Sequence, residues 1–271
     1  MQTSKFSQLF EETKPLIGMI HVQALPGTPN NRLSVSEIVK QSVNEANTLI
    51  KAGVQSIMLE NMHDIPYLKR KVGPEIVASM ASVAAAVRSQ TDLPMGVQIL
   101  AGANQAAISV ALAAGFQYIR AEGFVFGHLA DEGILEADAG DLLRFRKHVG
   151  AEHIQIFTDI KKKHSSHAIT ADISLKDTVE AAEFFQSDGV IITGTHTGKA
   201  VSKRDLEEVY PGTEIPVLVG SGVTPQDLAQ IWENADGFIV GSYFKKGGDW
   251  KNEPDPKRLD ELVKARESLL K

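Results

Sequence analysis

Short apolar strands and amphipathic helices alternate along nearly the whole 271-residue chain. Ser34 to Ala52, for example, carries apolar residues at helical spacing, stops at Gly53 and is followed by the apolar run Val54 to Leu59. About eight such pairs recur, with no change in composition that would mark a linker, and such alternation implies parallel pairing through right-handed crossovers. The sequence therefore predicts an α/β fold: a single (β/α)8 TIM barrel with parallel strands and an outer ring of helices, residues 1–271, in which residues 1–14 form an N-terminal extension.

An open, doubly wound sheet is the alternative for a chain that alternates in this way. Such a sheet often carries a GxGxxG fingerprint after its first strand, where it binds a dinucleotide. No such fingerprint follows the first predicted strand, Leu16 to Val22. Eight strand–helix units in a chain of this length favour the closed barrel.

Charge, cysteine content and the length of apolar runs limit the partners and the location that we expect for this protein. The formal net charge is −6 and the pI is near 5.8, without a long basic stripe, so we expect no nucleic-acid partner. The chain has no cysteine, which excludes disulfides and thiolate nucleophiles. Residues 1–14 contain no apolar core of signal-peptide length, and no apolar run approaches membrane-spanning length. We therefore expect a cytoplasmic protein without an integral membrane segment.

The stretch from Ile215 to Ser242 reads as strand, glycine turn, helix, strand and second glycine turn. Glycines and small hydroxyl residues leave backbone N–H groups accessible, which suits a phosphate. In (β/α)8 barrels phosphates often bind at the loops after the seventh and eighth strands. The alternative is that these glycines serve only tight turns. The predicted phosphate-binding residues are Gly220, Ser221, Gly222, Gly241 and Ser242.

Strand alternation gathers charged side chains at one end of the predicted barrel. Residues two apart on a strand share a side, and functional groups in this fold collect at the C-terminal strand ends. Charges are costly to bury unless they are paired or functional. The convergence predicts a catalytic or binding site, with a structural ion-pair network as the alternative. The inward positions on the second to fifth strands are Glu60, Gln98, Arg120, Glu122, Asp159 and Lys161.

The chemistry of these groups suggests their roles. Carboxylates could hold ribose hydroxyls or act as general bases, and a desolvated lysine such as Lys161 could form a Schiff base. His164 lies just beyond the fifth strand, where a general acid or base could reach a substrate. The catalytic candidates are Glu60, Glu122, Asp159, Lys161 and His164, and the substrate-binding candidates are His21, Asn61, Gln98, Arg120, Thr193 and Gly194.

Two further segments leave alternatives open. Glu60 to Asp64 contains oxygen and imidazole groups that could bind a metal, but no HExxH-like spacing occurs. We assign no metal ligand and no cofactor, with a divalent metal as the alternative. The turn from Thr193 to Gly198 could add a ligand contact through Thr197, or it could be a flexible surface loop.

Several segments together resemble the BtpA family of (β/α)8-barrel proteins, including its SgcQ-like branch. The segments lie in order and nearly end to end: GMIHVQALPGTP (Gly18 to Pro29), SIMLENMHDIPY (Ser56 to Tyr67), YIRAEGFVFGHLADEGIL (Tyr118 to Leu135), DIKKKHSSHA (Asp159 to Ala168), GVIITGTHTGKAVS (Gly189 to Ser202), VLVGSGVTPQDL and ADGFIVGSYFKKGGDW. His21, Glu60, Asn61, Arg120, Asp159, Lys161 and His164 fall on motif positions of the family, as do the glycines of the last two turns. The chain departs from the family at Val22 to Ala24, where the motif is closer to HLxPLPGSP. It departs again at Glu122, where the motif is closer to FIRVN.

The resemblance implies a phosphate-binding barrel whose branches are linked to nucleosidase activity and to photosystem I biogenesis. We expect an enzyme that acts on a small phosphorylated or ribosyl substrate by nucleosidase-like glycosyl hydrolysis. A carboxylate would stabilise an oxocarbenium-like centre and activate water, while His164 or another acid would protonate the leaving base. The alternatives are a non-catalytic assembly factor of the biogenesis type and a sensor of a phosphorylated ligand. The alanine-rich face of Ala78 to Val87 could contact another copy in a homo-oligomer, or it could be core.

Overall fold

The structure, a computed structural model, describes residues 5–194 and 201–271. Its centre is a closed barrel of eight parallel strands, in the order β1-β11-β10-β9-β7-β4-β3-β2. The prediction of a (β/α)8 barrel is therefore confirmed, and Thr197 lies outside the described residues. The barrel strands are β1 (Leu16–His21), β2 (Ser56–Glu60), β3 (Met95–Gln98), β4 (Tyr118–Ala121), β7 (Gln155–Ile160), β9 (Gly189–Ile192), β10 (Val217–Gly220) and β11 (Gly237–Val240).

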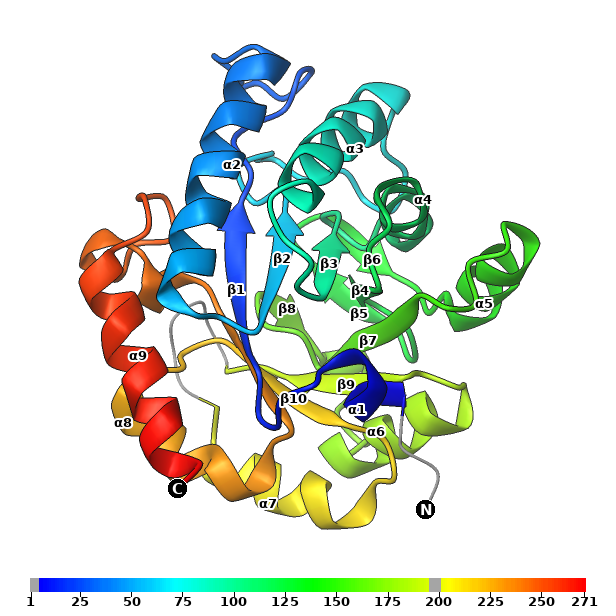
Figure 1. Ribbon diagram of the computed structural model, residues 1–271. Coiled ribbons are helices and arrows are strands. Elements are labelled where there is room, and N and C mark those ends of the chain that lie inside the picture. Colours follow the sequence, from blue (N-terminus) through cyan, green and yellow to red (C-terminus); the bar gives the residue numbers. More distant parts are fainter. Residues whose placement is uncertain (1–4, 195–200) are drawn as a thin grey trace.

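Helices surround the strands on the outside (Figure 1). The α-helices of this ring are α2 (Val35–Ala52), α3 (Pro74–Arg88), α4 (Asn104–Ala114), α5 (Ala139–His148), α6 (Leu175–Phe184), α7 (Lys203–Val209), α8 (Pro225–Ile231) and α9 (Pro256–Leu269). Short 3-10 helices are η1 (Ala168–Thr170), η2 (Tyr210–Gly212), η3 (Trp232–Asn234), η4 (Ser242–Phe244) and η5 (Lys246–Gly248).

The ends of α2 show how local sequence sets these elements. The Ser34 side chain accepts from the backbone N–H of Glu37, whose carboxylate in turn accepts from the backbone N–H of Ser34. At the other end Gly53 adopts φ of +86°, a left-handed conformation that terminates the helix. On α3, Val83, Ala84 and Val87 are buried in the core of this chain, so these three members of the alanine-rich segment are core residues.

Side chains inside the barrel follow the predicted alternation. An apolar cluster fills the interior and is separate from the larger core between strands and helices, where Ile154, Ile156 and Ile160 lie. Gly96 on β3 leaves room for the Tyr118 ring, because a Cβ atom at that position would overlap the ring. The interior cluster consists of Phe10, Ile17, Met19, Met58, Tyr118, Phe157, Ile191, Leu218 and Ile239.

The N-terminal extension closes the lower end of the barrel, where the strands begin. It contains helix α1 (Lys5–Leu9). The Phe6 ring lies 6.0 Å from the Phe157 ring, and the Phe10 ring lies 5.9 Å from the Tyr118 ring. Gln155 Nε2 donates a hydrogen bond of 2.9 Å to the Lys5 carbonyl. Residues 5–10 thus form the floor of the barrel, and the open end is the opposite one.

A small antiparallel sheet, which the sequence did not predict, lies in the loops at the C-terminal strand ends. It contains β5 (His128–Ala130), β6 (Gly133–Leu135) and β8 (Ser165–Ser166), in the order β6-β5-β8. β5 and β6 belong to the loop that follows β4, and β8 belongs to the loop that follows β7. The sheet thus joins two loops at the end of the barrel where the polar strand ends lie.

Across residues 5–194 and 201–271, no helix combines the length and apolar composition that crossing a bilayer requires. The longest helix, α2, has 18 residues and carries charged side chains along its exposed face. Homo-oligomer formation stays a prediction, since the structure holds one chain.

Candidate functional site

The C-terminal strand ends surround a cavity of about 510 Å³. Its walls come from the ends of β1, β2, β4 and β7 and from the turns after β10 and β11. The structure thus brings both predicted groups, the charged side chains and the glycine turns, to one rim. The predicted residues that line the cavity are His21, Glu60, Arg120, Glu122, Asp159, His164, Ser221, Gly222, Gly241 and Ser242.

Arg120 and Asp159 form a buried ion pair on one wall of the cavity. Arg120 Nη2 lies 2.9 Å from Asp159 Oδ1, and Arg120 Nε donates to both carboxylate oxygens at 3.1 and 3.2 Å. Burial disfavours the Arg120 cation, but the charges of Asp159 and Glu60 outweigh that effect and raise the pKa of Arg120. The guanidinium therefore stays charged and fixes the orientation of the Asp159 carboxylate.

Glu60 is a buried carboxyl group whose environment favours the protonated form. Burial raises its pKa, although the positive charges of Arg120 and Lys163 oppose the rise. Only 7% of the residue is exposed to solvent, in a wall that also carries Glu122 and Asp159. A raised pKa increases the protonated fraction of a carboxyl group at a given pH, which suits a general acid.

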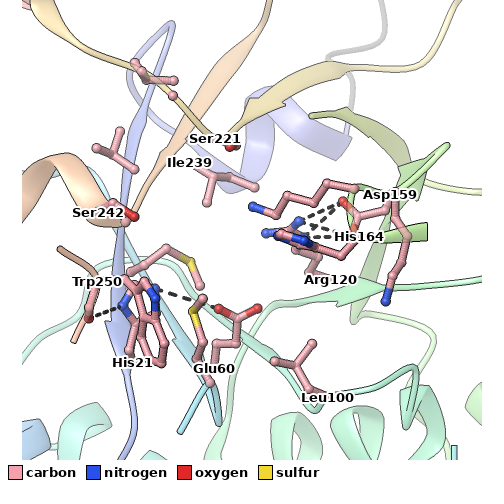
Figure 2. A pocket seen from close by; sticks show the side chains of 18 of the residues that line it. His21, Glu60, Leu100, Arg120, Asp159, His164, Ser221, Ile239, Ser242 and Trp250 are labelled. Carbon is pink, nitrogen blue, oxygen red and sulfur yellow. Dashed lines mark hydrogen bonds and ion pairs between the residues drawn. The ribbon is translucent and has the colours of Figure 1, made fainter. Parts of the chain in front are cut away.

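His21 lies beside Glu60 as a neutral imidazole. Burial, together with the positive charge of Lys245, lowers its pKa to about 3. His21 Nδ1 lies 3.0 Å from the Trp250 carbonyl oxygen, which can only accept, so Nδ1 carries the hydrogen. His21 Nε2 is then a hydrogen-bond acceptor, 3.8 Å from Glu60 Oε2 (Figure 2). The two groups lie within ion-pair distance, but a neutral imidazole forms no ion pair.

Lys161 does not enter the cavity, and this predicted placement is wrong. β7 ends at Ile160, and Lys161 adopts φ of +46°, a left-handed turn that breaks the strand alternation. The Lys161 ammonium instead donates to the Ile173 carbonyl. Its two successors line the cavity: Lys162 Nζ lies 3.1 Å from Glu122 Oε2, and Lys163 faces the same space. The cationic side of the site is therefore formed by Lys162 and Lys163.

Burial and neighbouring charges shift the pKa of Lys163. Desolvation lowers its pKa and the Arg120 charge lowers it further, while Glu60 and Asp159 oppose the shift. Within residues 5–194 and 201–271, no carboxylate lies within 4.0 Å of Lys163 Nζ and no hydrogen bond of this amine is observed. Lys163 thus presents an amine to the cavity without a fixed structural partner among these residues.

Several predicted residues lie behind the cavity wall. Asn61 donates from Nδ2 to Asp64 Oδ2 at 2.8 Å and accepts from the Leu100 backbone N–H at 2.8 Å, so it braces two loops. Gln98 Nε2 donates to Glu122 Oε1 at 3.2 Å and thereby supports that carboxylate. Neither side chain lines the cavity, which corrects their predicted placement as direct ligand contacts.

The remaining predicted residues off the wall are Thr193, Gly194 and Gly220. Thr193 is followed by the buried Gly194, and Thr193 Oγ1 is buried without a hydrogen-bond partner among the described residues. A Cβ atom at Gly220 would lie 2.8 Å from the Ile191 side chain, so this glycine serves packing inside the barrel. The part of the predicted phosphate turn that faces the cavity is Ser221 and Gly222.

The two glycine turns form another side of the cavity, with Ser221 across the cavity from Glu60 and Ser242 nearer to His21 (Figure 2). Ser221 has φ of +115° and Gly222 has φ of +66°. A serine with positive φ costs conformational energy, and such strain is frequent at ligand-binding turns. At Gly241 a Cβ atom would lie 3.1 Å from His21 Nε2, so glycine allows the close approach of that imidazole.

The segment after β11 and the start of α9 add cavity residues that sequence reasoning missed. Trp250 places its ring 5.9 Å from that of His21 and 4.8 Å from that of His63. Arg258 of α9 donates from Nε to the Tyr243 carbonyl at 2.6 Å and borders the glycine turns. These positions carry no strand-end signal, and only the shared cavity identifies them. The other missed residues of the wall include Tyr67, Asp131, Glu132, Lys162 and Lys163.

The oxygen and imidazole groups of Glu60 to Asp64 do not converge. Asp64 accepts from the Leu25 backbone N–H at 2.7 Å and from Thr28 Oγ1 at 3.0 Å, so its carboxylate holds the loop after β1. In the described parts of the chain, no group of three or more His, Cys, Asp or Glu side chains is arranged to hold a metal ion. The structure therefore assigns Asp64 a supporting contact.

Known sequences are similar to this chain over nearly its whole length. The model of the BtpA family matches residues 12–268. An uncharacterized mitochondrial protein of Caenorhabditis elegans is 47% identical over 97% of each chain. The photosystem I biogenesis protein BtpA of Synechocystis is 29% identical over 97% of this chain and 92% of its own. A cytoplasmic location stays a prediction.

Among solved structures, the thiamine phosphate pyrophosphorylase of Pyrococcus furiosus has a similar fold. The TM-score is 0.60 at 15% identity, and the similarity covers 95% of this chain and 97% of that enzyme. Identity this low supports the barrel fold and gives no information on the reaction.

Proposed function

The chain belongs to the BtpA family, and we propose that it is an enzyme that cleaves the glycosidic bond of a small phosphorylated ribosyl compound. The observation that carries the proposal is a cavity with two chemically different sides. One side consists of the strained turn at Ser221 and Gly222 and the turn at Gly241 and Ser242. The other side carries buried carboxyl groups and cations. A sugar phosphate has the same division, with a dianion at one end and a reacting carbon at the other.

The glycine turns and Arg258 support binding of the phosphate. Gly222, Val223 and Tyr243 lie in the wall of the cavity at these turns, and backbone N–H groups at such turns can bind an anion. Arg258 borders the same side of the cavity and adds a positive charge. Phosphate sites after the last two strands are frequent in this fold.

The carboxyl groups support glycosyl cleavage. Burial raises the pKa of Glu60, which favours its protonated form, and in that form Glu60 would donate its proton to the leaving base as the bond between C1 and nitrogen breaks. The Asp159 carboxylate, oriented by Arg120, would stabilise the positive charge that develops at C1. Water then adds to C1, its proton passes to the Glu60 carboxylate, and the free sugar phosphate is released. His164, exposed at the rim, is the alternative proton donor.

A panel of ligands tests this function. Thermal unfolding should shift upward with ribose 5-phosphate and with a nucleoside 5′-monophosphate but not with the free nucleoside, and chromatography should detect base release from the monophosphate. Gly222→Asp should abolish the shift, because it places a negative charge at the anion site. Gly222→Asn is the matched control, since asparagine has the same shape as aspartate and tolerates positive φ but carries no charge. Absence of any shift with phosphorylated ligands would contradict the proposal.

A non-catalytic assembly role is a second candidate, favoured by similarity to the Synechocystis biogenesis protein over nearly the full length of both chains. Under this function the barrel binds a membrane-complex partner, and its charged cavity does no chemistry. A pull-down would then recover the same partner with wild type and with the variants Glu60→Gln and Asp159→Asn. Base release that disappears in both variants would favour the enzyme instead.

A further inference from the structure

Lys163 places a primary amine among the acids and cations of the cavity. It lines the same space as Glu60 and Asp159 and interacts electrostatically with Arg120, Glu60, Asp159 and Glu122. The same cavity is lined by His21, Glu60, Arg120 and Asp159, which lie at the ends of β1, β2, β4 and β7. Lys163 therefore belongs to the charged side of the cavity.

The neighbouring lysines have other partners. The Lys161 ammonium donates to the Ile173 carbonyl outside the cavity, and Lys162 Nζ forms an ion pair of 3.1 Å with Glu122. Lys163 has no ion pair within 4.0 Å among the described residues. Of the three successive lysines, Lys163 is the one whose amine is positioned to react with a ligand.

We propose that Lys163 forms a covalent imine with C1 of the open-chain aldehyde form of a sugar phosphate bound in this cavity. The inference rests on the proposed function and names the covalent step available at the same site. The phosphate on the glycine turns would hold one end of the sugar, and the aldehyde carbon would lie at the charged side. The expected ligand class is an aldose phosphate.

The step balances with the residues present. Lys163 Nζ attacks the aldehyde carbon, a C–N bond forms, and the carbonyl oxygen leaves as water when the C=N bond closes. Of the three ammonium protons, one stays on the iminium nitrogen and two leave with the oxygen. Glu60 is a candidate to carry each proton in turn, because its carboxyl group lines the same cavity and interacts with Lys163. Water reverses the step and restores the amine.

Burial supports this role of Lys163. A lysine reacts as the neutral amine, and desolvation lowers the pKa of Lys163, so a larger neutral fraction is present near neutral pH than for an exposed lysine. The Arg120 charge acts in the same direction. The carboxylates oppose this shift while supplying the proton acceptor that the attack requires.

Borohydride trapping with ribose 5-phosphate tests the imine. Reduction should yield one adduct per chain, with a mass gain equal to ribose 5-phosphate less one oxygen atom. Peptide mapping should place the adduct on Lys163. Ribose without phosphate is the control for random reaction at exposed lysines, and it should give at least tenfold less adduct at this position.

Matched lysine variants sharpen the test. Lys163→Arg keeps the charge but cannot form an imine, so the specific adduct should disappear while the thermal shift with ribose 5-phosphate remains. Lys161→Arg should retain both the adduct and the shift, because Lys161 lies outside the cavity. Mapping of the wild-type adduct gives the answer even if Lys163→Arg fails to fold.

The outcomes separate this inference from the proposed function. A thermal shift with ribose 5-phosphate but no adduct, or an adduct on another lysine, overturns the imine and leaves the proposed function standing. Absence of both the shift and the adduct overturns both. A phosphate-dependent adduct on Lys163 that Lys163→Arg abolishes supports the inference.

Discussion

The lower and upper halves of the barrel interior differ in chemistry although the same strands build them. In the lower half, β2, β4 and β7 contribute the apolar residues Met58, Tyr118 and Phe157. Two residues further along, the same strands contribute the charged residues Glu60, Arg120 and Asp159. Both sets are at least nine-tenths buried, so burial alone does not distinguish core from site.

The difference shows where the stability and the function of the chain are expected to reside. Apolar side chains gain free energy when they leave water, whereas buried charges cost free energy unless they are paired. The floor made by Phe6 and Phe10 completes the apolar half, while the opposite half keeps a cavity of about 510 Å³. The lower half should therefore control unfolding, and the upper half should control ligand chemistry.

The largest expected effect on stability is that of Phe157→Ala. Removing this ring from the apolar half leaves a cavity next to Tyr118 and Phe6, and the free energy of unfolding should fall by about 3–5 kcal/mol. Chemical denaturation measures the change. Phe184→Ala is the matched control, because that ring is 81% exposed and its removal should change stability by about 0.5 kcal/mol or less. Equal losses of unfolding free energy in the two variants would contradict the assignment of stability to the lower half of the barrel.

Glu60→Gln, in the upper half of the barrel, should reduce activity and leave stability intact. Base release from a nucleoside 5′-monophosphate should fall by about 100-fold or more, because glutamine cannot donate the proton. Stability at neutral pH should be kept or increased, because the variant no longer buries a group that can ionise. Glu267→Gln, an exposed change on α9, is the control. Full activity of Glu60→Gln would contradict the assignment of this carboxyl group.

The smallest effect is in the pH dependence of stability. Burial raises the pKa of Glu60 above its ordinary value of 4.5, so the folded protein holds this proton more tightly than the unfolded chain. The stability that Glu60 contributes is complete below the unfolded pKa and is lost as pH rises through the folded pKa. The difference in unfolding free energy between Glu60→Gln and wild type should therefore grow above pH 4.5. A difference that stays constant with pH would show that Glu60 has an ordinary pKa.

Much of this organisation could be predicted from the sequence because strand geometry is regular. Residues two apart share a face, and that rule correctly placed Glu60, Arg120 and Asp159 inside the barrel. The rule failed at Lys161, where the strand has ended and a left-handed turn resets which side chains face inward. Because of this turn at Lys161, the lysines that line the cavity are Lys162 and Lys163.

The loop contributions could not be predicted for a different physical reason. Asp131 and Glu132 enter the cavity wall through an antiparallel sheet with strands of two or three residues, too short for a periodic signal. Trp250 reaches His21 through its backbone carbonyl, a contact that any residue type could make. Such contacts depend on the folded path of the loops, which local sequence does not determine.

The central claim is that a sugar phosphate binds across the cavity with its phosphate on the glycine turns and its reactive carbon among the acids. A crystal structure with ribose 5-phosphate tests it most directly. We expect the phosphate against the backbone of residues 221–223 and 242–243, with C1 next to Glu60 and Lys163. A phosphate bound elsewhere, or a sugar with C1 turned away from Glu60 and Lys163, would contradict the account.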